Sequence, residues 1–409
     1  MTVIARKMKR DLTVEEQLAR GPMDMPFLML TLLLTGIGLV MVFSSSYASA
    51  YYDVKVGNNP TYYFIRQAVF GVMGIIVMYI TSKINYQTFR WLSVFVLGVS
   101  VALLVLVLVP GIHTSRADGV RRWIKSIGPI PAFQPSEIAK LGVIMYFSAR
   151  LSKRGTEKKK QYDGRRLSGR AMGLLDRIGL VELFPYAAIL VLVTALMLQE
   201  PHMSGTILIL VGGAAVLFAA GIKLYWFVGG GAVMGFGLWY IIQNTDYMAS
   251  RISLWVDPWA DPLGKGYQTI QSLLAVGSGG LRGVGLGNSR QKFLSLPEPE
   301  NDYIFTIECE ELGFIGAAIV LILFALLIIR GYWIAVHARD RFGALLVVGV
   351  TTLIATQVFL NIAVISNLIP VTGISLPFFS YGGTALMIQL LEMGVVLSVS
   401  RQIPAARQG

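Results

Sequence analysis

The chain is dominated by long apolar stretches, and these constrain its fold more than any other feature. A helix that crosses the hydrocarbon core of a bilayer needs about 20 predominantly apolar residues. Ten stretches qualify: 26–47, 63–82, 91–110, 134–151, 181–199, 204–221, 224–243, 304–329, 343–366 and 377–400. Of the 409 residues, 55% are hydrophobic and only 14% are charged, against about 25% charged in a soluble domain. The sequence therefore predicts an all-α, polytopic membrane protein with a bundle of about ten transmembrane helices.

The distribution of Lys and Arg predicts the orientation of this bundle. If the N-terminus is inside, the inside tails and connections hold 23 Lys and Arg and the outside ones hold 10. Cytoplasmic loops are the ones enriched in these residues. We therefore expect cytoplasmic tails at 1–25 and 401–409 around a single transmembrane domain at 26–400. The placement of these charges matters more than the net charge of +12, and we predict no nucleic-acid partner.

The longest outside connection, about 244–303, is expected to carry function. Irregular backbone is not tolerated in lipid, so this loop must pack on the bundle or line a wet cavity. Its segment QTIQSLLAVG (268–277) predicts a short amphipathic helix. The glycine-rich GSGGLRGVGLG (277–287) matches neither common nucleotide-binding pattern. Its amides could hold a pyrophosphate together with neighbouring cations. A merely flexible loop explains the spacing equally well.

Ionisable residues inside the predicted spans are a second source of candidates, because such residues usually face the bundle interior and mark function. Glu137 and Lys140 are three residues apart on one helical face, which predicts an internal ion pair. Glu308 and Glu311 share one face and Glu310 lies roughly opposite. At least one of these three must then pair with another helix. For Glu310 and Glu311 we expect hydrogen bonds that stabilise the bundle.

Four long motifs occur in the chain: GVRRWIKSIGPIPAFQPSEIAKLG (119–142), DPLGKGYQTIQSLLAVGSGGLRGVGLGNSRQKF (261–293), LPEPENDYIFTIECEELGFIG (296–316) and NLIPVTGISLPFFSYGG (367–383). Together and in this order they resemble the FtsW/RodA/SpoVE family, the SEDS proteins. GLGNSRQKF followed by LPEP is more similar to the FtsW/SpoVE branch than to RodA. The resemblance covers about 26–400.

The resemblance implies ten helices and a peptidoglycan glycosyltransferase of the bacterial cytoplasmic membrane. Such an enzyme polymerises lipid II on the outer membrane face, in cell division or cell shape, beside a class B penicillin-binding protein (a transpeptidase) and other divisome or elongasome proteins. The family's functional aspartate corresponds to Asp302 in NDYIF. A carboxylate within reach of a sugar hydroxyl can take its proton, so Asp302 is the predicted catalytic base.

The leaving lipid diphosphate requires cations and hydrogen-bond donors. The substrate-binding candidates, taken from the family motifs and from nearby cations, are Arg121, Arg122, Gln134, Ser136, Glu137, Lys140, Arg251, Gln271, Arg282, Arg290, Lys292 and Ser380. A divalent cation, Mg or Mn, is a candidate cofactor at the diphosphate. Glu298 and Glu300 are either its ligands or simply solvated. No residue is assigned as a metal ligand.

Two departures from the family pattern limit what carries over. Asn301, preceded by Glu300, stands where a small residue such as Thr is usual, and EPHMSGT (200–206) stands where many members have QPDxGT. The aspartate of the QPDxGT motif has no counterpart in EPHMSGT, so any role of that aspartate is not transferred to this chain. Two other functions stay open: a lipid II flippase, which intramembrane charge and interrupted spans would also suit, and a non-catalytic scaffold. For Asp302 the structural alternative is a turn residue or the N-cap that opens the eighth span.

Overall fold

The structure, a computed structural model, describes residues 21–113, 122–126, 131–154, 179–200, 203–244, 252–264, 266–293 and 295–403. Its long helices occupy all ten predicted ranges: α3 (Met25–Tyr52), α4 (Tyr62–Lys83), α5 (Gln87–Leu108), α6 (Pro135–Leu151), α8 (Leu180–Gln199), α9 (Met203–Ala219), α10 (Leu224–Asn244), α13 (Ile304–Val336), α14 (Arg341–Ile365) and α15 (Gly383–Ser400). Shorter elements are η2 (Val54–Val56), η3 (Pro258–Ala260) and α12 (Tyr267–Ser278). The described parts contain no β-strand beyond two isolated bridges. The all-α prediction is confirmed.

Seven of these described helices are long and apolar enough to cross a membrane. The apolar helix α9 is shorter, and so is the apolar part of α10, Leu224–Gly237. Helix α6 has 17 residues and carries Glu137, Lys140 and Arg150. The polytopic membrane class is therefore supported by length and composition, while the count of ten spans stays a prediction.

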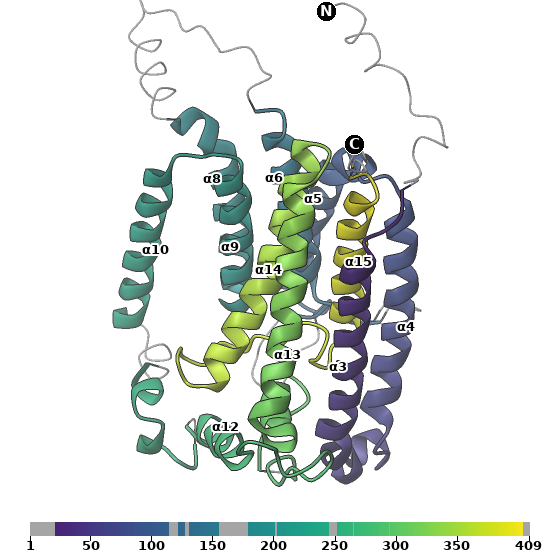
Figure 1. Cartoon of the computed structure of the whole chain (residues 1–409). Coiled ribbons are helices and arrows are strands. Elements are labelled where there is room, and N and C mark those ends of the chain that lie inside the picture. The colour runs from purple at the N-terminus through teal and green to yellow at the C-terminus, as the bar shows by residue number, and fades with distance from the viewer. Residues whose placement is uncertain are drawn as a thin grey trace, which may run out of the picture.

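The helices stand side by side in one bundle, with α10 as the exception (Figure 1). Helices α4 and α15 approach most closely, and glycines permit this contact. A Cβ at Gly394 would lie 2.6 Å from the carbonyl oxygen of Met78, and one at Gly74 would lie 2.6 Å from the Leu390 side chain. Helix α10 lies apart in Figure 1, and none of its described side chains is buried.

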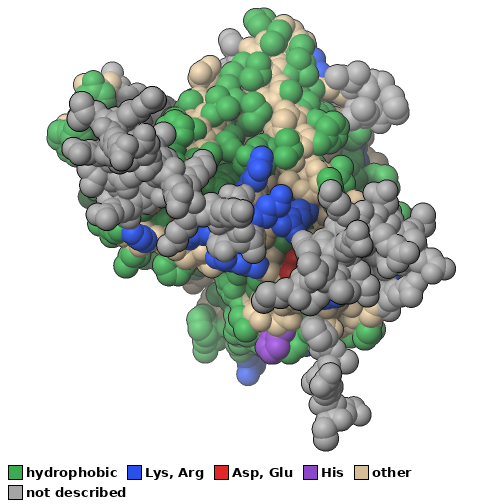
Figure 2. All heavy atoms as spheres, turned by 90° about the horizontal axis from the view of Figure 1, so that it is seen from above, with side chains coloured by type: hydrophobic (Ala, Val, Ile, Leu, Met, Phe, Trp, Pro, Cys, Tyr) green, Lys and Arg blue, Asp and Glu red, His purple; other side chains and the backbone are tan. Residues whose placement is uncertain are grey.

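The described chain starts and finishes at the same end of the bundle, where Arg401 Nη1 donates to the carbonyl oxygen of Gly21. Seen from that end, Lys and Arg side chains gather around the centre (Figure 2). Local capping explains two helix starts here: the Asp24 side chain accepts from Phe27 N at 3.0 Å, and that of Asp340 accepts from Gly343 N at 3.0 Å. The basic end agrees with the predicted cytoplasmic side, which stays a prediction.

The opposite end holds the long connection between α10 and α13, and its described part is packed on the bundle as expected. The amphipathic helix predicted at 268–277 is confirmed as α12. Thr269, Ile270 and Ser272 on α12 are buried, and Ser272 Oγ lies 3.0 Å from Thr306 Oγ1 of α13. Ser272 also donates to the carbonyl oxygen of Ile365, which joins α12 to the end of α14.

Candidate functional site

A cavity of about 430 Å³ opens at the end of the bundle that carries α12. Segments from both halves of the chain line it: α4, the loop before α6, α9, residues 298–302, α14, residues 373–382 and the start of α15. Its polar lining residues include Arg66, Arg122, Gln134, Glu137, Glu298, Asp302, Gln357, Ser380 and Gln389. The cavity therefore brings both carboxylates and guanidinium groups to one place.

Asp302 lies in the turn before α13, and its backbone is held by α14. Asn361 Nδ2 donates to the carbonyl oxygen of Asp302 at 2.8 Å and to that of Ile374 at 2.6 Å. One amide thus joins two loops that line the cavity. The N-cap residue of α13 is Tyr303, so Asp302 is not the cap, but it does lie in the turn before the helix, as the other structural alternative predicted.

The carboxylate of Asp302 faces the backbone of Gly373. A Cβ on Gly373 would lie 3.2 Å from Asp302 Oδ2, and Gly373 has φ +69°, a conformation that L residues rarely adopt. Glycine at this position therefore serves two purposes: it permits the turn, and it leaves space beside the carboxylate.

The two acids that precede Asp302 separate in the fold. Glu298 is exposed, lines the cavity and has φ 45°, and its Oε2 accepts from Asn301 Nδ2 at 2.7 Å. Glu300 is buried instead: its carbonyl oxygen accepts from Tyr381 N at 2.8 Å and its Oε2 from Ser49 Oγ at 3.3 Å. The interpretation of Glu300 as a solvated side chain is therefore wrong.

Arg122 and Trp123 line the cavity from the connection between α5 and α6. Backbone hydrogen bonds fix this segment, because Ile124 N donates to Phe133 O at 3.0 Å and Lys125 N donates to Ile112 O at 3.0 Å. Two predicted cations, Arg121 and Arg251, lie outside the described residues.

Arg66, in the first turns of α4, is a lining residue that the sequence analysis did not select. Its Nη1 donates to the hydroxyl of Tyr62 at 2.7 Å. A lone Arg inside an apolar stretch was the available signal, since such a residue usually marks a functional position.

Helix α6 contributes the predicted ion pair. Lys140 Nζ lies 2.8 Å from Glu137 Oε2, and both residues are buried. Gln134 and Glu137 line the cavity, whereas Ser136 and Lys140 are not among the lining residues. The Ser136 hydroxyl is buried and has no hydrogen-bond partner among the described residues. Lys140 therefore acts on the cavity through Glu137.

Comparison with known proteins decides the family. The family model described as "Cell cycle protein" (FtsW, RodA and SpoVE) matches residues 25–404. The chain belongs to the FtsW/RodA/SpoVE family.

Two members of this family can be aligned with nearly the whole length of the chain. Stage V sporulation protein E of Bacillus subtilis (strain 168) is 41% identical over 379 residues, which are 92% of this chain and 97% of that protein. "Probable peptidoglycan glycosyltransferase FtsW" of Geobacter sp. (strain M18) is 38% identical over 384 residues, 94% of this chain and 98% of that protein.

Two solved structures share the fold. A chain from the structure described as "Structural coordination of polymerization and crosslinking by a peptidoglycan synthase complex" has a TM-score of 0.71 and 27% identity, and the match covers 95% of this chain and 99% of that one. RodA of Thermus thermophilus has a TM-score of 0.62 and 25% identity, with 94% and 98% covered.

The glycine-rich segment of this FtsW/RodA/SpoVE chain completes a broken helix. Gly313, inside α13, has φ 66° and ψ −169°, which interrupts the helical hydrogen bonds. Val284 N and Gly285 N donate to the carbonyl oxygens of Glu310 and Glu311, each at 3.0 Å. In return, Phe314 N donates to Gly280 O at 2.8 Å. The amides of Val284 and Gly285 thus donate to carbonyl oxygens of α13 and are not available to a pyrophosphate. For these two amides the interpretation as a pyrophosphate cradle is wrong.

Close contact between the two backbones explains the glycines themselves. A Cβ on Gly283 would lie 2.1 Å from the carbonyl oxygen of Glu311, and one on Gly313 would lie 2.2 Å from Gly283 N. Neither position has room for a side chain. The loop is therefore packed and not merely flexible.

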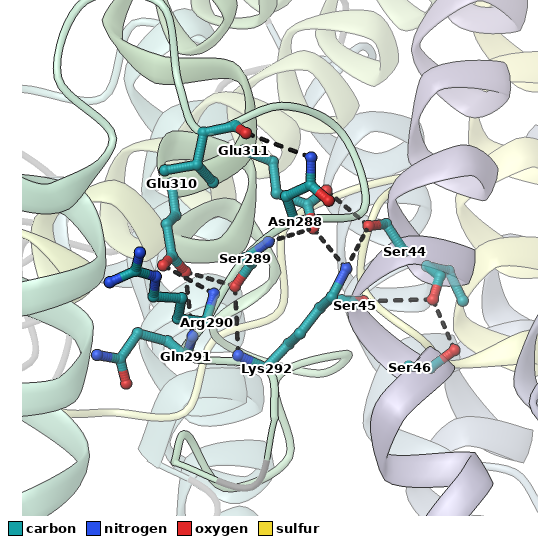
Figure 3. A network of polar contacts seen from close by, with 12 residues as sticks. Ser44, Ser45, Ser46, Asn288, Ser289, Arg290, Gln291, Lys292, Glu310 and Glu311 are labelled. Carbon is teal, nitrogen blue, oxygen red and sulfur yellow. Dashed lines mark hydrogen bonds and ion pairs between the residues drawn. The ribbon is translucent and has the colours of Figure 1, made fainter.

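The next residues of this loop form a buried polar network with α3 and α13 (Figure 3). Lys292 Nζ lies 2.7 Å from Glu311 Oε1, and Ser44 Oγ of α3 donates to Glu311 Oε2 at 2.6 Å. Glu310 accepts from the Ser289 hydroxyl and, at 3.0 Å, from Arg290 N. The prediction that Glu310 and Glu311 stabilise the bundle through hydrogen bonds fits this geometry.

The network changes the set of substrate-binding candidates. Lys292 is 2% exposed and its ammonium pairs with Glu311, so we remove it from the proposed substrate site. Gln271, Arg282 and Arg290 are not among the cavity-lining residues either, and Ser380 is. Ser380 Oγ accepts from Leu376 N at 2.7 Å, which shapes a turn that lines the cavity.

For the candidate divalent cation, the described residues contain no group of three or more His, Cys, Asp or Glu side chains that could hold a metal ion. Glu298 and Asp302 are the acidic residues of the 298–302 turn that line the cavity. They could contribute two oxygens to a cation that the diphosphate also binds. We assign no chemical step to such a cation.

Proposed function

We propose that this chain is a peptidoglycan glycosyltransferase that polymerises lipid II into glycan strands on the outer face of the bacterial cytoplasmic membrane. The name of the FtsW relative from Geobacter supports the activity. The observation that carries the proposal is the cavity in which Asp302 lies together with Arg66 and Arg122. A volume of about 430 Å³ falls in the usual range of small-ligand sites, about 300–1,000 Å³.

In the proposed reaction, Asp302 accepts the proton of the 4-hydroxyl group of an acceptor GlcNAc. The oxygen attacks the anomeric carbon of the donor sugar as the bond from that carbon to the diphosphate oxygen breaks. The lipid diphosphate leaves with the bonding electrons. Arg66 and Arg122 stabilise the charge that develops on it, because guanidinium groups match phosphate geometry. Asp302 then returns its proton to solvent.

The partner and the orientation are part of the same proposal. The solved structure at a TM-score of 0.71 belongs to a peptidoglycan synthase complex that coordinates polymerisation with crosslinking. This supports a class B penicillin-binding protein as the partner that crosslinks the product. The basic end of the bundle supports cytoplasmic termini, which would place the cavity on the outer face where lipid II is polymerised.

The test is an in vitro polymerisation assay with the purified chain, its penicillin-binding partner and lipid II. Asp302→Asn should lower the rate of glycan polymerisation by about 10²- to 10⁴-fold while partner binding and thermal stability stay at wild-type values. Asp257→Asn is the matched control: Asp257 is an exposed aspartate in the same long connection whose side chain accepts from Trp259 N at 3.0 Å. This variant should polymerise lipid II like the wild type.

Each alternative function has its own signature in this assay. Undiminished polymerisation by Asp302→Asn would remove Asp302 from the mechanism. A folded wild-type complex that makes no polymer would refute the glycosyltransferase. Transfer of lipid II between vesicle leaflets would then indicate a flippase, and partner recruitment without transfer would indicate a scaffold.

A further inference from the structure

Glu200 is a buried acid behind the cavity for which the proposed reaction has no role. It follows the last residue of α8, Gln199, at the same end of the bundle as the cavity. Its exposed fraction is 0%. Four and five residues later, Ser204 and Gly205 of α9 line the cavity, whereas Glu200 is not a lining residue. The acid therefore lies next to the substrate site without contacting the space inside it.

The carboxyl group of Glu200 is poorly supported by its surroundings. Neither oxygen has a hydrogen-bond partner among the described residues. Burial raises the pKa of Glu200 to about 8, and the charge of Arg122 opposes this shift. An ionised carboxylate without hydrogen bonds is costly in a buried site. Near neutral pH the acid is therefore mostly protonated.

Among the described residues, Arg122 is the charged group that acts on Glu200. Helices α5, α6 and α9 pack against α8. Helix α9 carries no ionisable side chain. Arg90 of α5 and Arg150 of α6 belong to helix turns at the opposite end of the bundle, and Glu137 and Lys140 of α6 pair with each other. Among the described residues, the charge of Arg122 is thus what couples Glu200 to the cavity, without a hydrogen bond between the two side chains.

Arg122 itself lines the cavity. We propose that Glu200 is a positioning residue for Arg122, which sets how much of the guanidinium charge is available to the substrate diphosphate. As a neutral acid, Glu200 leaves that charge to the diphosphate. As an anion, it draws the guanidinium toward itself and competes with the substrate. The inference rests on the proposed function, because it requires a diphosphate at Arg122.

The competition predicts a change in substrate affinity with pH. Between pH 7 and pH 9 the KM of the wild type for lipid II should rise about three- to tenfold, since a tenfold change corresponds to about 1.4 kcal/mol, the scale of one charge-assisted contact. The kcat should change much less, because Glu200 does not contact the reacting atoms. In Glu200→Gln the side chain cannot ionise, so its KM should stay at the low-pH value of the wild type.

The experiment measures initial polymerisation rates against lipid II concentration from pH 6.5 to 9.5, with the full chain and its penicillin-binding partner. Wild type and Glu200→Gln are compared at each pH, so that titration of Asp302 and of the substrate cancels. Glu182→Gln is the matched control, because Glu182 is also on α8 but pairs with Arg154 at the opposite end of the bundle. It should keep the wild-type pH profile of KM.

A second readout is independent of catalysis. Because the pKa of Glu200 is raised from 4.5 to about 8 in the folded protein, the wild type loses stability relative to Glu200→Gln as the pH rises from about 4.5 to 8. The melting temperature of the purified wild type should therefore fall over that window relative to the variant and level off above it. A KM profile of Glu200→Gln that follows the wild type would overturn the inference. So would equal melting curves at pH 9 if the variant proves too inactive to assay. Absence of polymerisation by the wild type would instead refute the proposed function.

Discussion

Glu298 and Asp302, before Ile304, and Glu310 and Glu311, after it, have opposite environments, although they belong to one continuous stretch of sequence. Glu300, also before Ile304, is buried like the second pair. Before it, Glu298 and Asp302 line the cavity. After it, Glu310 and Glu311 are 1% and 0% exposed. The loop at 284–292 supplies these two with hydrogen-bond donors, and Lys292 neutralises Glu311. The comparison teaches that neither the type nor the spacing of an acidic residue decides whether it supports the bundle or faces the cavity, and that Glu310 and Glu311 support the bundle because the loop supplies their donors.

Glu308 is a third case within the same stretch. It is 0% exposed and, among the described residues, neither of its oxygens has a hydrogen-bond partner. It does not line the cavity. Nothing in the described structure explains why this position carries an acid.

The largest effects should come from substituting one acidic residue on each side of Ile304, Asp302 before it and Glu311 after it. Asp302→Asn should lower the polymerisation rate by about 10²- to 10⁴-fold, the usual contribution of a general base, without changing the melting temperature. Glu311→Ala should instead lower the melting temperature, because its effect is on stability and not on the chemical step. It leaves the Lys292 ammonium buried and unpaired, which costs about 3–5 kcal/mol of stability. Thermal unfolding and polymerisation assays on both variants check the pair.

A double variant tests whether the Glu311 effect is electrostatic. Lys292→Met combined with Glu311→Leu removes both charges, so much of the lost stability should return. If the double variant is no more stable than Glu311→Ala, the ion pair is not what holds the loop to α13.

The next largest effect concerns the break in α13 that brings the loop to these acids. Gly313→Ala places a side chain where φ is 66° and where Cβ would lie 2.2 Å from Gly283 N. We expect a loss of stability on the order of 3 kcal/mol, since such a conformation is essentially restricted to glycine. Gly277→Ala is the control, because Gly277 lies in α12 and a Cβ there would meet nothing within 4 Å. An unchanged melting temperature in Gly313→Ala would contradict the structural role of the break.

A moderate effect is expected at the residue that holds the Asp302 turn. Asn361→Ala removes the amide that bonds the carbonyl oxygens of Asp302 and Ile374. The rate should fall about tenfold, because each net hydrogen bond is worth about 1 kcal/mol and the carboxylate loses its fixed position. Ser366→Ala, near the end of α14, removes an exposed side-chain hydrogen bond and should have wild-type activity. A wild-type rate in Asn361→Ala would show that the turn holds its position without α14.

The smallest effect should come from substituting Glu298, which lines the cavity. Glu298→Gly relieves a non-glycine residue at φ 45°, so stability should rise by about 0.5–1 kcal/mol. If Glu298 is only solvated, activity and its dependence on added Mg²⁺ should match the wild type. A raised Mg²⁺ requirement would instead identify Glu298 as a ligand of the candidate cation.

Much of the fold could be predicted from local sequence alone. Apolar length predicted a helix in each of the ten ranges, and the amphipathic pattern predicted α12. The site was harder. The motif around NDYIF selected Asp302, and the QPSEIAK motif selected Gln134 and Glu137, all of which line the cavity. Arg66 was missed and Lys292 was chosen wrongly, since distance along the chain does not say which cation a carboxylate neutralises.

The sequence by itself determined that this chain is a membrane protein and roughly where its long helices lie, because hydrophobicity acts between residues that are close along the chain. Only the tertiary structure decided which polar groups meet. Ser44 and Glu311 are 267 residues apart, and Asn361 lies 59 residues from Asp302. The long-range packing of α3, α13 and α14 sets those distances, and through them the burial and the charge of each carboxylate.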